Sequence, residues 1–356
     1  MKQGRTLSEV LGTLSEQKAS KADYIAPAPA MGFSPDARTF AIYRPVERGG
    51  WLEFGMTDLF HRQVGTALGI PAKYYEAMQK EKPQLLVENV NTWLNDKAQS
   101  YMVRTLDYDG TQTARAFLSE RYRRIDNLDV ASAVLPMFAG KEGMEVASCA
   151  VTESRLYLKI VNHRLEREVV PGDVVQAGIL ISNSEVGLGA VTVQPLIYRL
   201  VCSNGMIVSE LGERRAHIGR ANRNTDTGFE FYTDETIEAE DRAFMLKLRD
   251  TAKAALEEAQ FAQAVNQLQE AAQAPITGHV QEVVELTGKT YDLNQSEQES
   301  VLDYLIRGGD LSLYGLSNAI TKASQDVESY DRATALESIG WQVATMPANQ
   351  WRSING

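Results

Sequence analysis

The feature that most constrains this chain is a stretch of alternating apolar residues near its middle. In DVVQAGILIS, residues 173–182, an apolar side chain stands at every second position, at Val175, Ala177, Ile179 and Ile181. Because successive side chains of a β-strand point to opposite faces, this spacing predicts a strand with one face against a core. Upstream, MEVASCAVT and RLYLKIV predict a hairpin. The region from 144 to 208 is therefore expected to form antiparallel strands.

The last part of that region, GAVTVQPLIYRLVCSNGMIV, continues the strands but contains two breakers. Pro195 has no N–H to donate, so it predicts an edge, a bulge or a break. The pair Asn204-Gly205 predicts a turn. The preceding EVGLGA has a GxG but lacks the third glycine and the strand–helix setting of a dinucleotide site, so we predict a glycine-permitted bend there.

Strands and short helices are also predicted before residue 144. SYMVRTL and TQTARAFL flank the turn DYDG, which predicts a second hairpin. Thr39 to Pro45 and Trp51 to Phe54 are predicted to be extended, and APAPAMGFSPD is predicted to be a Pro-rich connector. Capping and proline signals predict three short helices over 57–97. Together these patterns predict an α+β fold, an antiparallel sheet core with flanking helices.

The chain changes character beyond residue 226. From Thr236 to about Gln273 it is rich in helix-forming residues and nearly free of breakers, which predicts one long helix or a bent pair. Three shorter helices are expected after it. We therefore divide the chain into an N-terminal helix or arm at 1–30, an α+β core domain at 31–225 and an acidic helical region at 226–356.

Charge is distributed unevenly between these parts. The net charge is −11, but residues 1–225 hold 27 Lys and Arg against 25 Asp and Glu, whereas residues 226–356 hold 9 against 22. An acidic protein repels nucleic acid at long range. Because physiological salt screens charges within about 8–10 Å, a locally basic face can still bind it.

The composition also bears on location. No apolar run of about 18 residues predicts a transmembrane helix, and the N-terminus lacks the apolar segment of a secretory signal. The two cysteines, Cys149 and Cys202, have neither CxxC spacing nor a histidine cluster beside them. We therefore expect neither a disulfide framework nor a zinc site, and a reducing cytoplasm.

No catalytic constellation stands out in the sequence. It contains no GxxxxGK[ST], no GxSxG and no histidine pair with zinc-hydrolase spacing. We therefore expect no cofactor and no metal, and a binding protein rather than an enzyme. One weaker alternative stays open, a nucleic-acid-processing enzyme with an unrecognised metal site that uses Asp107, Asp109, Glu185 or His217.

Two arginine-rich stretches are the strongest candidates for a binding site. Arginine presents a planar fork that suits phosphate oxygens, and aromatic side chains between arginines give a platform for unpaired bases. The candidate nucleic-acid-binding residues are Arg121, Tyr122, Arg123, Arg124, Tyr198, Arg199, Arg214, Arg215, His217, Arg220 and Arg223. A competing interpretation is a network of ion pairs, because carboxylates stand close by in sequence, at Glu120, Asp126, Glu210 and Glu213.

Three segments carry a resemblance to a known family. They are FLSERYRRIDN, the run GILISNSEVGLGAVTVQPLIYRLVCSNGMIV at 178–208, and LYGLSNAITKASQDVESYDRATALESIGWQVA at 313–344. With its YR-x-VC-x-NG and NA-[IV]-T motifs, the chain resembles the phage- and plasmid-like proteins of the domain-of-unknown-function 932 family. The resemblance implies genes on phages, plasmids or transferred islands, beside genes for single-strand binding proteins, annealing recombinases and exonucleases. It supplies no catalytic residue.

The leading hypothesis is a nucleic-acid-binding protein of phage or plasmid replication or recombination, of the single-strand annealing type that uses no ATP. Single-stranded DNA is the expected ligand, with duplex DNA as an alternative. A homo-oligomer is expected, because it would join the basic surfaces of net-acidic subunits. A recombination exonuclease or a single-strand binding protein is the expected partner. The runner-up is a non-enzymatic mobile-element protein that binds a host or phage protein, for instance to blunt a defence system.

Overall fold

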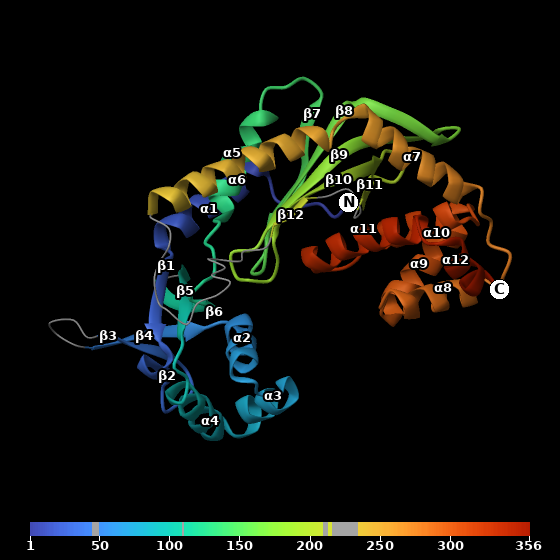
Figure 1. Ribbon diagram of the computed structural model, residues 1–356. Coiled ribbons are helices and arrows are strands. Elements are labelled where there is room, and N and C mark those ends of the chain that lie inside the picture. Colours follow the sequence, from blue (N-terminus) through green and yellow to red (C-terminus); the bar gives the residue numbers. More distant parts are fainter. Residues whose placement is uncertain (45–49, 109, 209–212, 216–233) are drawn as a thin grey trace.

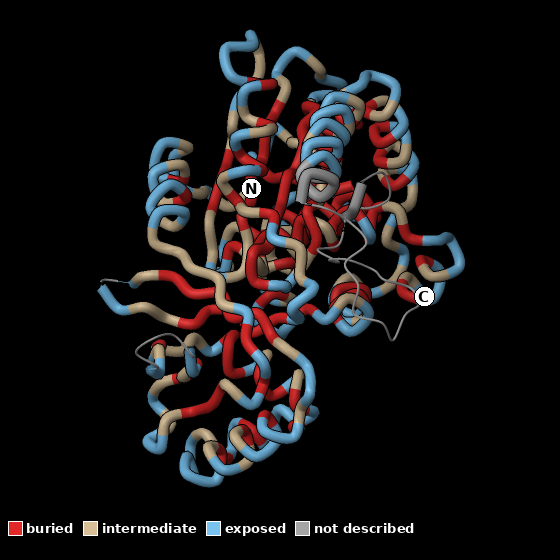
Figure 2. The backbone as a smooth tube through the Cα atoms, turned by 60° about the vertical axis from the view of Figure 1, so that its left-hand side comes forward, coloured by how far each residue is buried: buried red, intermediate tan, exposed pale blue. Residues whose placement is uncertain are grey.

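Two six-stranded sheets form the framework of the protein, and helices cover their faces (Figure 1). The computed structural model describes residues 1–356 except 45–49, 109, 209–212 and 216–233. Buried residues run along the strands of both sheets (Figure 2). The predicted fold class, an antiparallel sheet core with flanking helices and a helical C-terminal region, is confirmed.

The first sheet lies before residue 120. In spatial order its strands are β1 (Ala22–Pro27), β5 (Ser100–Tyr108), β6 (Thr111–Ser119), β4 (Gly50–Met56), β3 (Phe40–Arg44) and β2 (Met31–Phe33). All neighbours are antiparallel except β4 and β6, which are parallel. The predicted hairpin of β5 and β6 and the predicted extended segments, β3 and β4, are confirmed. The segment predicted as a connector contains part of β1 and all of β2, since an edge strand tolerates proline.

Three helices cover one face of this sheet, as predicted: α2 (Asp58–Leu68), α3 (Ala72–Glu81) and α4 (Pro83–Asn95). Thr57 caps α2 by accepting the backbone N–H of Phe60, and Gly69 ends it with a φ of 74°. Between α2 and the sheet, Phe60 of α2 packs edge to face with Phe40 of β3 and Phe117 of β6 in a buried cluster. The first sheet therefore has a hydrophobic core of its own.

The second sheet is built from the strands predicted after residue 144. Its order is β11 (Asn204–Ile207), β10 (Val191–Arg199), β9 (Asp173–Asn183), β8 (Leu156–Val170) and β7 (Met144–Val151), and β12 (Glu213–Arg215) also pairs with β10. All of these pairs are antiparallel. The alternating residues of β9 are buried as predicted, but Leu180 on the other face is buried too, because helices cover both faces. The predicted core domain thus contains two sheets with separate cores.

Pro195 marks a break in the pairing of β10. On one side it pairs with Ile179 of β9. On the other side β11 pairs with residues 196–199 and β12 with residues 191–193, so Pro195 falls between the two partner strands. The Pro195 carbonyl accepts the N–H of Val208, so it points toward the side of β11 and β12. In an antiparallel strand the nitrogen and the carbonyl of one residue point to the same side, so the Pro195 nitrogen also points there. The missing donor therefore faces the break, where no ladder hydrogen bond needs it.

The turn predicted at Asn204-Gly205 lies slightly earlier, at residues 200–203, where Ser203 adopts a φ of 51°. Asn204 and Gly205 belong to β11 instead. The predicted bend in EVGLGA is confirmed, because Gly187 adopts a φ of 79° between β9 and β10.

Helices enclose the second sheet from both sides (Figure 1). On one face lie α1 (Leu7–Ser20), α5 (Asn127–Val134), α6 (Asp234–Ala254) and α7 (Glu258–Ala272). Beside β11 and on the opposite face lie α10 (Leu313–Ala323) and α11 (Tyr330–Ala344). The remaining helices are α8 (Val280–Thr290), α9 (Gln295–Gly308) and α12 (Ala348–Asn355).

Two expectations about the acidic helical region need refinement. The predicted bent pair is found as α6 and α7, but five helices follow instead of three, because caps at Asn294, Ser312 and Ser329 start new helices. The expected boundary at 225 lies outside the described residues. Both α6 and α7 pack on the second sheet, so the acidic helical region shares that core.

Candidate nucleic-acid interface

The first predicted arginine cluster lies in the loop between β6 and α5. Arg121 is exposed, while Arg123 forms an ion pair with Glu240 of α6 at 3.3 Å. Arg124 is half exposed and lies 3.6 Å from a carboxylate oxygen of Asp23. Carboxylates therefore engage part of this cluster, but Glu240 and Asp23 are distant in sequence and are not among the near neighbours that the competing interpretation names.

Tyr122, the aromatic residue within this cluster, is only partly exposed to solvent. Its hydroxyl donates to the carbonyl of Ser184 at 2.9 Å, and its ring packs beside Val186 and Leu118. Burial raises the pKa of the Tyr122 hydroxyl. A stacked base would have to displace this packing, so we do not assign base stacking to Tyr122.

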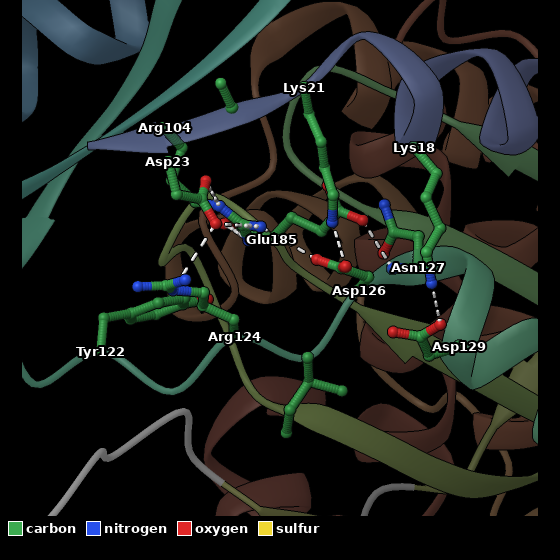
Figure 3. A network of polar contacts seen from close by, with 12 residues as sticks. Lys18, Lys21, Asp23, Arg104, Tyr122, Arg124, Asp126, Asn127, Asp129 and Glu185 are labelled. Atoms are coloured by element: carbon green, nitrogen blue, oxygen red, sulfur yellow. Dashed lines mark hydrogen bonds and ion pairs between the residues drawn. The ribbon is translucent and has the colours of Figure 1, made fainter. Parts of the chain in front are cut away.

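Beneath the loop, a buried polar network joins the two sheets (Figure 3). At its centre Arg104 of β5 donates to both oxygens of Asp23, to Asp126 at 2.9 Å and to the carbonyl of Glu185 at 3.0 Å. The Arg104 side chain is only 1% exposed. Because a buried guanidinium is costly without partners, this set of acceptors makes Arg104 a structural link between β1, β5 and the second sheet.

Glu185 extends this network from the bend after β9. Its carboxylate pairs with Arg115 of β6 and accepts the backbone N–H of Asn127 at 2.6 Å. The amide of Asn183 donates to the carbonyl of Ile125 and to the side chain of Asn127. Two of the segments that carry the family resemblance, FLSERYRRIDN and the ISNSE stretch, therefore meet here and build a joint between the sheets.

The carboxylates and the cations of this joint pair with one another, and this pairing keeps Asp126 ionised. Burial alone favours the neutral acid of Asp126, but hydrogen bonds and charge from Lys21 and Arg104 outweigh it and lower the pKa of Asp126. Among the described residues, no group of His, Cys, Asp and Glu is arranged to hold a metal ion. Glu185 is engaged by Arg115, and Asp107 accepts the N–H of Gly110 in the turn, while Asp109 and His217 lie outside the described residues.

The residues of the second predicted cluster lie in different parts of the fold and have different partners. Arg199 forms a close ion pair with Asp173, whose other contact is the hydroxyl of Tyr314 in α10. The Arg199 guanidinium also lies 5.8 Å from the centre of the Tyr314 ring. Arg199 thus links the second sheet to α10, and we do not assign it to an open binding surface.

Part of the YR-x-VC-x-NG motif contacts the NA-[IV]-T helix, α10, through Arg199 and Asn204. Asn204 is buried and its amide donates to the hydroxyl of Thr321 in α10. Tyr198 is half-buried on β10. Arg214 and Arg215 lie in β12, opposite Thr192 and Val191, whereas His217, Arg220 and Arg223 lie outside the described residues.

A groove beside the first cluster brings arginines together from two elements. Arg124 from the loop before α5, and Arg242 and Arg249 from α6, line one open groove of about 620 Å³. Its apolar lining comes from Ile125, Ala133, Pro136, Met137, Met245 and Leu246. In the described part of the chain, no carboxylate lies within ion-pair distance of Arg242 or Arg249. We call this site the α5–α6 groove.

The sequence of α6 explains why its arginines reach the groove. Phe244, Leu248 and Ala252 recur every four residues and are buried against α1, α5 and the second sheet. Arg242, Met245 and Arg249 form a neighbouring stripe at i, i+3 and i+7, which lines the groove. Neither arginine is among the candidates predicted from the sequence, because the net charge of the acidic helical region hides them. Their helical spacing is the signal that was available.

Comparison with known proteins places this architecture in a family. A family model described as a domain of unknown function (DUF932) matches residues 114–329. The chain belongs to the DUF932 family. The DUF932 match runs from β6 to the start of α11, so it contains the α5–α6 groove and the contact of Arg199 and Asn204 with α10, and it leaves most of the first sheet outside.

The other comparisons add no relative to this DUF932 protein. No curated protein and no solved structure matches the chain. Among the described residues, none of the helices combines the length and apolar character that crossing a membrane requires.

Proposed function

We propose that this DUF932 protein binds single-stranded nucleic acid in the α5–α6 groove. The observation that carries the proposal is the convergence of Arg124, Arg242 and Arg249 on one groove. Its other lining residues are mainly apolar, together with Ser132 and Asp129, whose carboxylate pairs with Lys18. Guanidinium groups bind phosphate oxygens through paired N–H donors, and they keep their charge at any physiological pH.

The floor of the groove favours an unpaired strand over a duplex. Met137 from the turn after α5 and Met245 and Leu246 from α6 line it, and of these Met137 is buried and Leu246 is 56% exposed. In a duplex the base faces are hidden in the stack, whereas an unpaired base can lay its face on apolar side chains. Phosphates would then lie along the arginine rim, with bases turned inward.

The biological setting that we propose follows the family resemblance. Binding of single strands would serve the replication or recombination of a phage or plasmid in the bacterial cytoplasm. The protein would anneal complementary strands without using ATP. The net charge of −11 opposes long-range attraction of DNA, so a homo-oligomer that places several α5–α6 grooves in a row would strengthen binding by effective concentration.

Salt dependence tests the groove directly. Each phosphate contact to a single strand contributes about 0.7 to the slope of log affinity against log salt. The double variant Arg242→Gln/Arg249→Gln should therefore bind a fluorescent oligothymidine more weakly than wild type, with a slope that is shallower by about 1.4. The measurement is fluorescence anisotropy over a series of salt concentrations.

A matched control separates the groove from overall charge. Arg307→Gln/Arg352→Gln removes the same two charges from exposed positions on α9 and α12. This control should leave the salt slope unchanged. Equal slopes for wild type and the groove variant would remove the α5–α6 groove as the strand-binding site.

A further inference from the structure

A small cavity lies between the second sheet and the helices α7 and α10. Strands β9, β10 and β11 contribute to its lining, and so do Asn204 of β11 and Asn318 of α10. Asn204 belongs to the YR-x-VC-x-NG motif and Asn318 to the NA-[IV]-T motif. Asn204 is 2% exposed and Asn318 is 8% exposed. Bulk solvent therefore cannot hydrate these two amides as it hydrates a surface asparagine, and their partners must lie inside the protein.

Each of the two side chains leaves one polar atom without a protein partner. In the part of the chain that the structure describes, neither Oδ1 of Asn204 nor Nδ2 of Asn318 has a hydrogen-bond partner. The hydroxyl of Thr321 fixes which way the Asn204 amide is turned. It donates its single hydrogen to the carbonyl of Asn318 at 3.0 Å, so it can only accept from Nδ2 of Asn204. Asn204 therefore presents an acceptor and Asn318 a donor, and a buried atom of either kind is costly without a partner.

These two atoms decide what kind of ligand fits between them. The ligand must donate a hydrogen bond to Asn204 and accept one from Asn318. A cation accepts no hydrogen bond, and an anion has no hydrogen for Asn204, whereas a water molecule can do both. Arg199 also lines the cavity but adds no net charge there, because its guanidinium pairs with Asp173.

The cavity also has the size of one water molecule. It leaves about 10 Å³ in which the centre of a water molecule can lie. A buried water needs roughly 10–15 Å³ of such space and two to four polar partners, so nothing larger fits. We propose that a single ordered water bridges Oδ1 of Asn204 and Nδ2 of Asn318. The two motifs of the family resemblance thus supply the two halves of one water site, which joins β11 to α10.

The first test is magnetisation transfer from water to side-chain amide protons in the wild-type protein. It is measured in the rotating frame, where direct contact and chemical exchange give opposite signs. We expect a contact cross peak between water and the amide protons of Asn318. The matched control is Asn183, which is also buried but donates to the carbonyl of Ile125 and to the side chain of Asn127, so its amide should show none. If the Asn318 amide shows no contact cross peak either, the water site is refuted.

The second test excludes transfer through a hydroxyl group. Oxygen-17 relaxation dispersion detects water alone, and Asn318→Leu should remove the contribution of about one long-lived water, because it replaces the donor by an apolar group of similar volume. Equal amplitudes for wild type and folded Asn318→Leu would refute the water site. Should Asn318→Leu fail to fold, the cross peak of the wild-type protein decides alone. No oligonucleotide takes part in either test, so failure of the water site leaves the proposal for the α5–α6 groove standing.

Discussion

Replacing Glu337 by alanine is expected to lower the free energy of unfolding by about 3–5 kcal/mol, the usual cost of removing one partner of a buried ion pair. The Glu337 carboxylate of α11 accepts from the ammonium of Lys159 in β8 at 2.6 Å. Neither side chain has any exposure to solvent. With Glu337 gone, Lys159 keeps only the face of the Tyr330 ring, 4.7 Å from its nitrogen. The charge of Lys159 would then be buried without an acceptor.

The measurement is urea unfolding followed by circular dichroism. The double variant Lys159→Met/Glu337→Leu should recover most of the loss, because an apolar pair of similar volume removes the cost of desolvating two charges. Arg307→Ala serves as the control, since its side chain is 75% exposed and its ion pair with Asp303 contributes little. A loss below about 1 kcal/mol for Glu337→Ala would mean that water reaches this pair.

Arg104→Met is expected to cost a similar amount, about 3–5 kcal/mol, because it leaves carboxylates in the joint without their main partner. Asp23 loses a two-pronged contact and Asp126 loses one of its two cations. Arg124 lies 3.6 Å from Asp23 and is half exposed, so it replaces little of what is lost. Arg38→Met, at a side chain that is 85% exposed, should change stability by less than about 0.5 kcal/mol.

The same variant should change how stability depends on pH. The lowered pKa of Asp126 stabilises the folded protein above the pKa of the unfolded state, near 3.8, and this contribution is lost as the pH falls below it. Without Arg104 the pKa of Asp126 moves up toward the unfolded value, so stability should fall less steeply in acid. Unfolding curves between pH 2 and pH 5 measure this, and parallel curves for variant and wild type would show that Arg104 does not stabilise the Asp126 carboxylate.

Local patterns predicted the elements of this fold well. The alternation in β9, the turn between β5 and β6, and the cap of α2 at Thr57 each depend on neighbouring residues, so they can be read from the sequence. The division into two sheets could not be read in this way. It depends on contacts such as that of Arg104 with Asp23, which are 81 positions apart.

The partners of the arginines also could not be predicted from local sequence. Arg199 and Arg242 look alike in sequence, yet Arg199 is held by Asp173 while Arg242 lines the groove. Only the pairing of distant segments decides which guanidinium has a carboxylate partner. Residues of the motifs that carry the family resemblance take part in the contact between the two sheets, through Asn183 and Asn127, and in the contact between the second sheet and α10, through Asn204 and Thr321.

Hydrogen exchange in the presence and absence of a saturating oligothymidine tests the central claim most directly. We expect slower exchange of backbone amides in residues 124–137 and 239–250, which border the α5–α6 groove, and unchanged exchange in α8, α9 and α12. Bound oligothymidine with no added protection in either of those two segments would contradict strand binding in the α5–α6 groove.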